Sequence, residues 1–330
     1  MRRCLALFLG LAACAPVEEA PVDPGTPVDP LYLPDTSDID FPAAYAEAFA
    51  LALSVRTAPV WRGHVDALAL AAPGCPDLWA GAPDDALEVD TDAPGVSWAD
   101  HCAAGTVDFG GAAYWETDVS VTGDATTAEG QITSAARTLI SDAVVGQAGE
   151  TRFELDGEAT DALTRTVAPD YDRYTWSSLV QGTVTGTNVL ADTPTPGGYR
   201  ADVYLYVEGG DSARLEARGN VYLYEDRVAE RFDSLAADLS YVGVGGPSDC
   251  TREPTGWLSL RDSDAYWYDL VFLPGNADDV DTGLDPACDG CGTLYVRGVE
   301  SGEVCVDLSS AWDGRLSPPE TSEFVWSIHG

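Results

Sequence analysis

Between Ala112 and Gly245, apolar and polar residues alternate in short runs that repeatedly end at glycine. In each run, β-branched or aromatic residues recur at every second position, which places them on one face of a pleated strand. The pattern therefore predicts consecutive strands that form an antiparallel meander. The six runs are Tyr114–Gly123, Thr151–Gly157, Thr175–Gly186, Tyr199–Gly209, Ala213–Tyr224 and Ser234–Val242.

The last third of the chain continues this strand pattern. We expect residues 75–248 to form the meander and residues 249–330 to continue the same domain, although the glycines before Pro247 mark an alternative boundary. The predicted fold class is mainly β: an antiparallel meander that forms a sandwich or a partly open barrel, with a short N-terminal helical segment. The further runs are Gly256–Arg261, Ala265–Phe272, Thr293–Val299, Glu303–Leu308 and Phe324–Ile328.

Helical periodicity is confined to residues 39–74. Asp40 can cap a helix, Pro42 suits its first turn, and large apolar residues recur at every fourth position from Tyr45. A second helix is expected over Val60–Ala71, bracketed by prolines. We interpret the two helices as a lid or plug that packs on the sheet.

The hairpin of Tyr199–Glu208 and Ala213–Tyr224 has large side chains on both faces. Two arrangements are open: the sheet is covered on both sides, or one face exposes a row of tyrosines. An exposed row would suit a carbohydrate, a peptide or a lipid, because tyrosine combines an apolar ring with a polar tip. The four tyrosines that share this face are Tyr204, Tyr206, Tyr222 and Tyr224.

The charge balance excludes several mechanisms and partners. The 330-residue chain has 55 acidic and 17 basic residues, and all the basic residues are arginine. Without lysine there is no Schiff-base, P-loop or Ser-x-x-Lys chemistry. A formal charge of −38 repels nucleic-acid phosphates, so we expect no nucleic-acid partner.

The N-terminus has the layout of an export signal, with Arg2 and Arg3 before the apolar run Leu5–Ala13. It ends in Leu11-Ala12-Ala13-Cys14, which resembles the lipobox of bacterial lipoproteins. The resemblance implies that residues 1–13 are removed by signal peptidase II and that Cys14 carries a lipid anchor in the membrane. Ala15, by the sorting rule of enteric lipoproteins, favours the outer membrane. The alternative is an ordinary secretory signal in which Cys14 is incidental.

Residues 14–38 are rich in proline and aspartate and cannot build a core. We expect an extended tether that holds the folded part away from the lipid surface.

Six cysteines after the tether are disulfide candidates, because an exported protein folds in an oxidising compartment. We expect Cys75 to pair with Cys102. For the others we favour Cys250–Cys305 and Cys288–Cys291. A four-thiolate zinc site and a redox-active Cys288–Cys291 pair are the alternatives.

A glycine-containing loop concentrates oxygen ligands of the kind that calcium prefers. Its spacing does not match an EF-hand, so the alternatives are weak calcium binding and a solvated acidic loop. Calcium is the one cofactor that the sequence suggests. The candidate ligands are Asp278, Asp279, Asp281 and Asp285.

The three histidines, His64, His101 and His329, have no spacing typical of a metal or catalytic site. We therefore expect a non-catalytic binding or structural lipoprotein at the outer membrane. A carrier of an apolar ligand is the first alternative and a carboxylate-dependent glycoside hydrolase the second. A large apolar concavity would favour the carrier, an exposed tyrosine row would favour binding, and two buried carboxylates in a cleft would favour the hydrolase.

Overall fold

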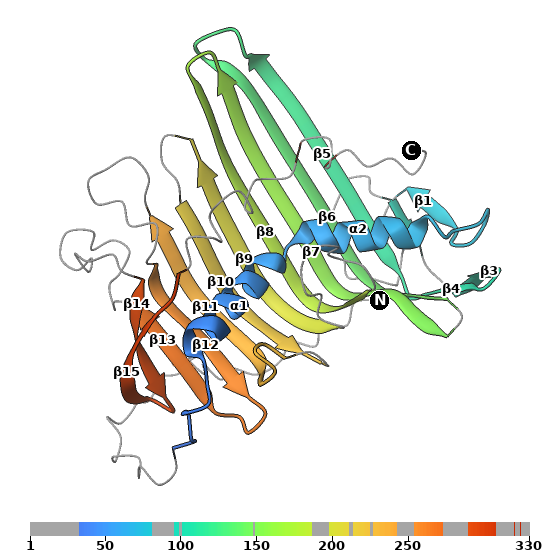
Figure 1. The fold of residues 1–330 in the computed structure, drawn as a ribbon. Coiled ribbons are helices and arrows are strands. Elements are labelled where there is room, and N and C mark those ends of the chain that lie inside the picture. The colour runs from blue at the N-terminus through green and yellow to red at the C-terminus, as the bar shows by residue number, and fades with distance from the viewer. Residues whose placement is uncertain are drawn as a thin grey trace, which may run out of the picture. The chain divides into compact units, whose positions relative to one another are not determined.

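The computed structural model divides the chain into two compact units, Met1–Asp35 and Thr36–Gly330. It describes residues 33–80, 96–98, 101–147, 149–186, 198–210, 214–224, 227–242, 254–272, 290–307, 320 and 324. All the helices and strands given below belong to the second unit (Figure 1).

Fifteen strands of the described residues form one sheet in which all neighbours are antiparallel. They are β1 (Leu78–Ala80), β2 (Val96–Trp98), β3 (Cys102–Ala104), β4 (Val107–Gly110), β5 (Ala113–Asp124), β6 (Gly130–Gln147), β7 (Glu150–Ala168), β8 (Tyr171–Gly186), β9 (Tyr199–Gly209), β10 (Arg214–Leu223), β11 (Phe232–Val242), β12 (Thr255–Asp262), β13 (Trp267–Phe272), β14 (Cys291–Val296) and β15 (Val299–Cys305).

From β5 to β15, each strand pairs with the next strand in the chain. The β1–β2 pair extends the sheet beside β5, while β4 pairs with the far end of β6 and with β3. The predicted fold class is confirmed: the protein is mainly β, and its antiparallel meander is a single sheet that does not close. Strands β12–β15 extend this same sheet, so no two-sheet sandwich forms among the described residues.

Several predicted strand limits need correction. β9 has the predicted bounds, but the sequence did not predict β6, and β7 continues through Gly157 to Ala168. Gly157 lies opposite Gly182, and a Cβ added to it would lie 2.0 Å from the carbonyl oxygen of Gln181. Glycine there permits close approach of two strands and does not end one. β15 begins and ends earlier than predicted.

Two helices precede the sheet, as predicted. The backbone N–H of Ala43 donates to Asp40 Oδ1 at 3.2 Å at the start of α1 (Phe41–Ser54), and Pro42 lies in its first turn. α2 (Thr57–Leu68) begins three residues earlier than predicted, because Pro59 lies within its first turn, where no intrahelical donor is needed.

Both helices pack across one face of the sheet, which we call the covered face (Figure 1). α1 contacts β10, β11, β12 and β15, whereas α2 contacts β7 and β8. The Tyr45 hydroxyl donates to the carbonyl of Tyr268 at 2.8 Å, and the backbone N–H of Thr57 donates to Ser178 Oγ at 3.1 Å. The prediction that the helices pack on the sheet is thus confirmed.

The structure contains the predicted Cys75–Cys102 disulfide and a second disulfide between Cys291 and Cys305. The prediction that Cys305 pairs with Cys250 and Cys291 with Cys288 was therefore wrong. Cys291 begins β14 and is the register partner of Cys305 in β15, so sheet pairing brings these two sulfurs together. Cys250 and Cys288 lie outside the described residues.

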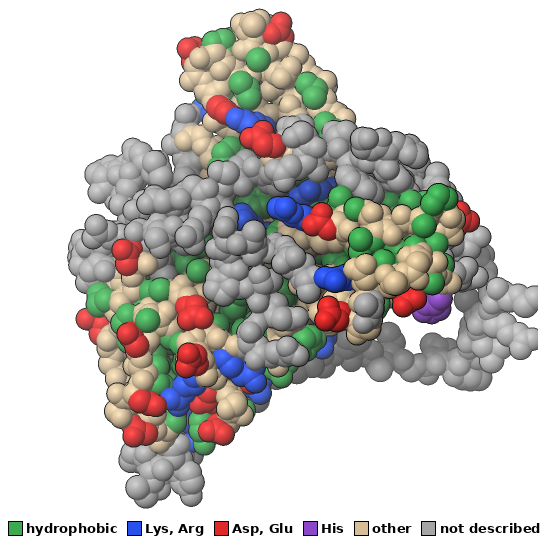
Figure 2. All heavy atoms as spheres, turned by 45° about the vertical axis from the view of Figure 1, so that its right-hand side comes forward, with side chains coloured by type: hydrophobic (Ala, Val, Ile, Leu, Met, Phe, Trp, Pro, Cys, Tyr) green, Lys and Arg blue, Asp and Glu red, His purple; other side chains and the backbone are tan. Residues whose placement is uncertain are grey.

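On the face that Figure 2 shows, the acidic side chains are spread out. In the view of Figure 2, acidic side chains occupy many separate positions, and several lie next to arginines. Such a distribution is typical of a solvated surface and does not by itself define a site.

Candidate functional site

Five exposed aromatic side chains, four in β9–β13 and Tyr224 directly after β10, lie on the face of these strands opposite the helices, which we call the outward face. Strand alternation produces this arrangement: Leu205 and Leu258 are fully buried on the covered face, while their chain neighbours Tyr204 and Trp257 point outward. The exposed fractions are 37% for Tyr204, 40% for Tyr222, 42% for Tyr224, 38% for Trp257 and 37% for Trp267.

The strand register arranges the outward face in rows. In the first row, Tyr204 lies opposite Arg218, Arg218 opposite Asp238, and Asp238 opposite Trp257. The first row therefore has an aromatic residue at each end and an arginine and an aspartate between them.

The second row lies four residues along the strands from the first. It runs through Arg200, Tyr222, Ser234, Arg261 and Trp267. Like the first row, it separates two aromatic side chains by polar ones.

Short side chains occupy the register positions between the two rows. Asn220, Ala236 and Ser259 follow one another across β10, β11 and β12. Ser259 is buried and its hydroxyl donates to Asp269 Oδ1 at 2.5 Å. The side chains between the two rows are thus shorter than the aromatic side chains in the rows.

The charges along the first row compensate one another. Arg218 forms ion pairs with Glu216 at 3.2 Å and with Asp238 at 3.3 Å, and Arg214 also pairs with Glu216. The first row thus presents hydrogen-bond donors and acceptors side by side, whereas the second row contains two arginines, Arg200 and Arg261, and no acid.

Two tyrosines of this face are held in the protonated form. Burial and the hydrogen bond that Tyr206 donates to Glu208 at 2.6 Å raise the pKa of Tyr206 to about 12. Burial and the charge of Glu216 raise the pKa of Tyr204. At neutral pH both phenols therefore keep their protons.

All four predicted tyrosines lie on this side of the sheet. Tyr206 is half-buried, whereas Tyr204, Tyr222 and Tyr224 are exposed. The rings of Tyr222 and Tyr224 meet edge to face at 5.6 Å, and the Tyr224 hydroxyl lies 3.1 Å from Thr183 Oγ1. Of the two arrangements that the sequence left open, the described residues leave this face exposed, with three of the four tyrosines distributed over it and not in a single row.

Sequence reasoning missed Trp257 and Trp267. The signal was present, because each alternates with a buried residue of its own strand, Leu258 and Tyr268. What the sequence could not give is the register that places these tryptophans in rows with the tyrosines.

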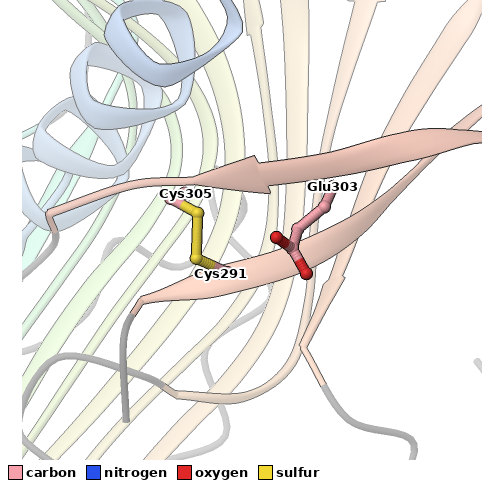
Figure 3. Close-up of side chains that lie close together, drawn as sticks. All are labelled: Cys291, Glu303 and Cys305. Atoms are coloured by element: carbon pink, nitrogen blue, oxygen red, sulfur yellow. A yellow bond between two sulfur atoms is a disulfide. The ribbon is translucent and has the colours of Figure 1, made fainter. Parts of the chain in front are cut away.

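A second cluster of chemically active groups lies at the edge of the sheet. Cys291, Glu303 and Cys305 place their ligand atoms within 4.8 Å of one another. The two sulfurs are bonded to each other, with the Glu303 carboxylate beside them (Figure 3). A disulfide offers no thiolate, so this cluster does not hold a metal in the oxidised protein.

His64 is part of the core. Its ring lies 4.9 Å from that of Trp115 and about 6 Å from those of Trp61, Trp98 and Phe153. Burial lowers the pKa of His64 to about 3, so the imidazole is neutral at physiological pH. His101 lines an open depression of about 550 Å³ together with Asp108, Phe109 and Val144.

Asp161 and Asp262, the two least exposed carboxylates of the described residues, each have a partner. Asp161 accepts from Arg137 Nε at 2.6 Å and from Trp176 Nε1 at 3.1 Å. Asp262 accepts from the Tyr268 hydroxyl at 2.8 Å. These hydrogen bonds compensate the cost of burying the two carboxylates, so both acids have a structural role.

Several predicted sites lie outside the described residues. They are the lipidation site Cys14, the calcium candidates Asp278, Asp279, Asp281 and Asp285, and His329.

No protein-family model matches the chain, and neither the curated proteins nor the solved structures give a significant match. None of the helices in the described ranges is both long and apolar enough to cross a membrane. The function must therefore be argued from the chemistry of the described surface and from the N-terminal sequence.

Proposed function

We propose that this chain is a non-catalytic, lipid-anchored binding protein of the bacterial cell envelope, and that its ligand docks on the outward face. The observation that carries the proposal is the group of five aromatic side chains, each more than a third exposed, on one face of consecutive strands. Exposed aromatic clusters of this kind are typical of interaction sites, because water solvates their rings poorly.

The N-terminal sequence supports a place in the envelope. Leu11-Ala12-Ala13-Cys14 follows a short apolar run, and the proline-rich residues 14–38 provide an extended tether. The outer membrane is the proposed location. A lipid on Cys14 would hold a strongly acidic body at a membrane whose anionic lipids repel it.

The two other functions receive less support. A carrier needs an apolar space beneath the helices, but Tyr45, Phe49 and Trp61 of the helices are buried on the covered face. A glycoside hydrolase needs two carboxylates free to react, whereas Asp161 and Asp262 are held in hydrogen bonds.

Co-sedimentation with delipidated envelope fragments of the source bacterium tests binding. The full chain with Cys14→Ser, which cannot be acylated at that position, should sediment with the fragments. Adding Tyr222→Ala and Trp257→Ala should weaken binding at least tenfold, because truncation of two contacting aromatic residues typically costs more than about 1 kcal/mol each.

A matched control replaces two exposed aliphatic residues of β6, Ile132→Ala and Val144→Ala, and should bind as before. Equal sedimentation of all three proteins would overturn the proposed binding face. The anchor has its own readout: mass spectrometry of the native protein should find an acylated N-terminal Cys14, and an unmodified Met1 would contradict it.

A further inference from the structure

We infer that the ligand of the outward face is an uncharged glycan chain that lies across strands β9 to β13. This inference rests on the proposed function, because it names the chemical class that the same face would bind. Four features of the face lead to it: the spacing of the rings, the groups between them, the balance of charge and the position of the strands in the sheet.

The spacing of the rings calls for an extended ligand. Tyr204 and Trp257 lie in one row and are three strands apart, as are Tyr222 and Trp267 in the other. At about 4.8 Å for each strand, three strands span about 14 Å, and the two rows, four residues apart, are separated by about 13 Å. A single small molecule would meet one ring, whereas a chain can contact several.

The groups between the rings are those that hydroxyls require. A sugar presents an apolar C–H face to an aromatic ring and hydroxyls, which both donate and accept, at its edge. Between Tyr204 and Trp257 stand the donor Arg218 and the acceptor Asp238, already oriented by their ion pair at 3.3 Å. An acyl chain would instead need continuous apolar surface, which these charges interrupt.

The charge balance favours an uncharged ligand. Arg218 of the first row and Arg214 beside it are both paired with acids, so the first row offers no cationic site for sulfate, phosphate or uronate groups. The charged residues of the second row are Arg200 and Arg261. The formal charge of −38 on the chain also repels polyanions.

The position of the strands argues against a peptide. Peptides commonly bind a sheet by pairing with an exposed edge. Strands β9 to β13 each have a neighbour on both sides, so their backbone groups are already paired. A ligand on this face must bind through side chains alone, as a glycan does.

The test uses the full chain with Cys14→Ser and three samples of the same delipidated envelope fragments. One sample is treated with periodate, which cleaves the vicinal diols of sugars, one is digested with protease and one is left untreated. We expect periodate to lower the bound fraction at least tenfold and protease to leave it within twofold. Binding that survives periodate and is lost after protease overturns the glycan in favour of a protein ligand.

Absence of binding to untreated fragments would instead overturn the proposed function itself, so the two failures are distinguishable. Binding that requires the lipids removed from the fragments would identify a lipid and overturn the glycan. Raising NaCl from 50 to 500 mM should change binding less than twofold, because an uncharged ligand has no charge to screen. A loss of tenfold or more would show an ionic ligand.

Two substitutions of Trp257 distinguish the loss of a ligand contact with its ring from a loss of folding. Trp257→Phe keeps an aromatic face and should retain binding within about threefold, whereas Trp257→Ala should lose at least tenfold. Because Trp257 is outside the core, both variants should keep the thermal unfolding midpoint of the parent within a few degrees. Equal binding of both variants would overturn a contact at this ring.

Discussion

Trp257 and Leu258 are neighbours in the chain and lie on opposite faces of β12, one exposed and the other buried under the helices. The same division separates Tyr204 from Leu205 in β9. Because side chains alternate strictly along a strand, a slip of one residue in register would exchange the two faces. The outward face is therefore specified by the same residues that build the core.

His64 gives the clearest prediction at the scale of one residue. Its pKa is about 3 in the folded protein and about 6.5 in an unfolded chain. As the pH falls below 6.5, the unfolded state binds a proton that the folded state excludes, so folding should lose about 1.4 kcal/mol for each pH unit down to about 3.

Urea unfolding of the wild type and of His64→Leu between pH 7.5 and pH 4 would measure this contribution. The variant has its own stability at pH 7.5, so the informative quantity is how the difference between the two proteins changes with pH. We expect the wild type to lose stability relative to His64→Leu as the pH falls. A constant difference would show that the buried imidazole is not the titrating group.

At the scale of elements, β6 shows why part of the sheet escaped prediction. Its covered face carries Arg137 and Ser141 among apolar residues, so the alternation of apolar and polar positions is broken. Arg137 pairs with Asp161 of β7, and its guanidinium lies 5.4 Å from the ring of Trp61 in α2. Arg137, which interrupts the alternating pattern of β6 in the sequence, thus connects this strand to β7 and to α2 in the structure.

Arg137→Gln should lower the free energy of unfolding by about 3–5 kcal/mol, because it leaves the buried carboxylate of Asp161 without its charge partner. Arg62→Gln is the matched control: Arg62 and Asp66 are exposed and 3.8 Å apart, so its loss should cost less than about 0.5 kcal/mol. Chemical denaturation of both variants at pH 7 measures the difference. Similar costs for the two would contradict a structural role for the buried pair.

Features that a short sequence motif or spacing indicates were predictable, whereas features that depend on the register between two strands were not. Asp40 and Pro42 identify the start of α1, and the 27-residue separation of Cys75 and Cys102 suggested their disulfide. The partner of Cys305 depended on the register of β14 and β15, which no spacing in the sequence gives.

At the scale of the whole molecule, the meander was predictable because each strand pairs mainly with its neighbour in the chain. The sequence could not show which face the helices cover, since that depends on where α1 and α2 dock. Once docked, they bury one set of alternating residues and leave Tyr204, Tyr222, Trp257 and Trp267 exposed on the other face. The candidate site is thus a consequence of covering one side of an open sheet.

Hydroxyl-radical footprinting tests most directly whether the outward face is the binding face. The full chain with Cys14→Ser would be oxidised with and without saturating delipidated envelope fragments, and modified residues would be quantified by mass spectrometry. We expect the fragments to protect Tyr222, Trp257 and Trp267 at least threefold and to leave Ile132 and Val144 unchanged. Equal oxidation of the aromatic residues in both samples, or protection confined to β6, would contradict the account.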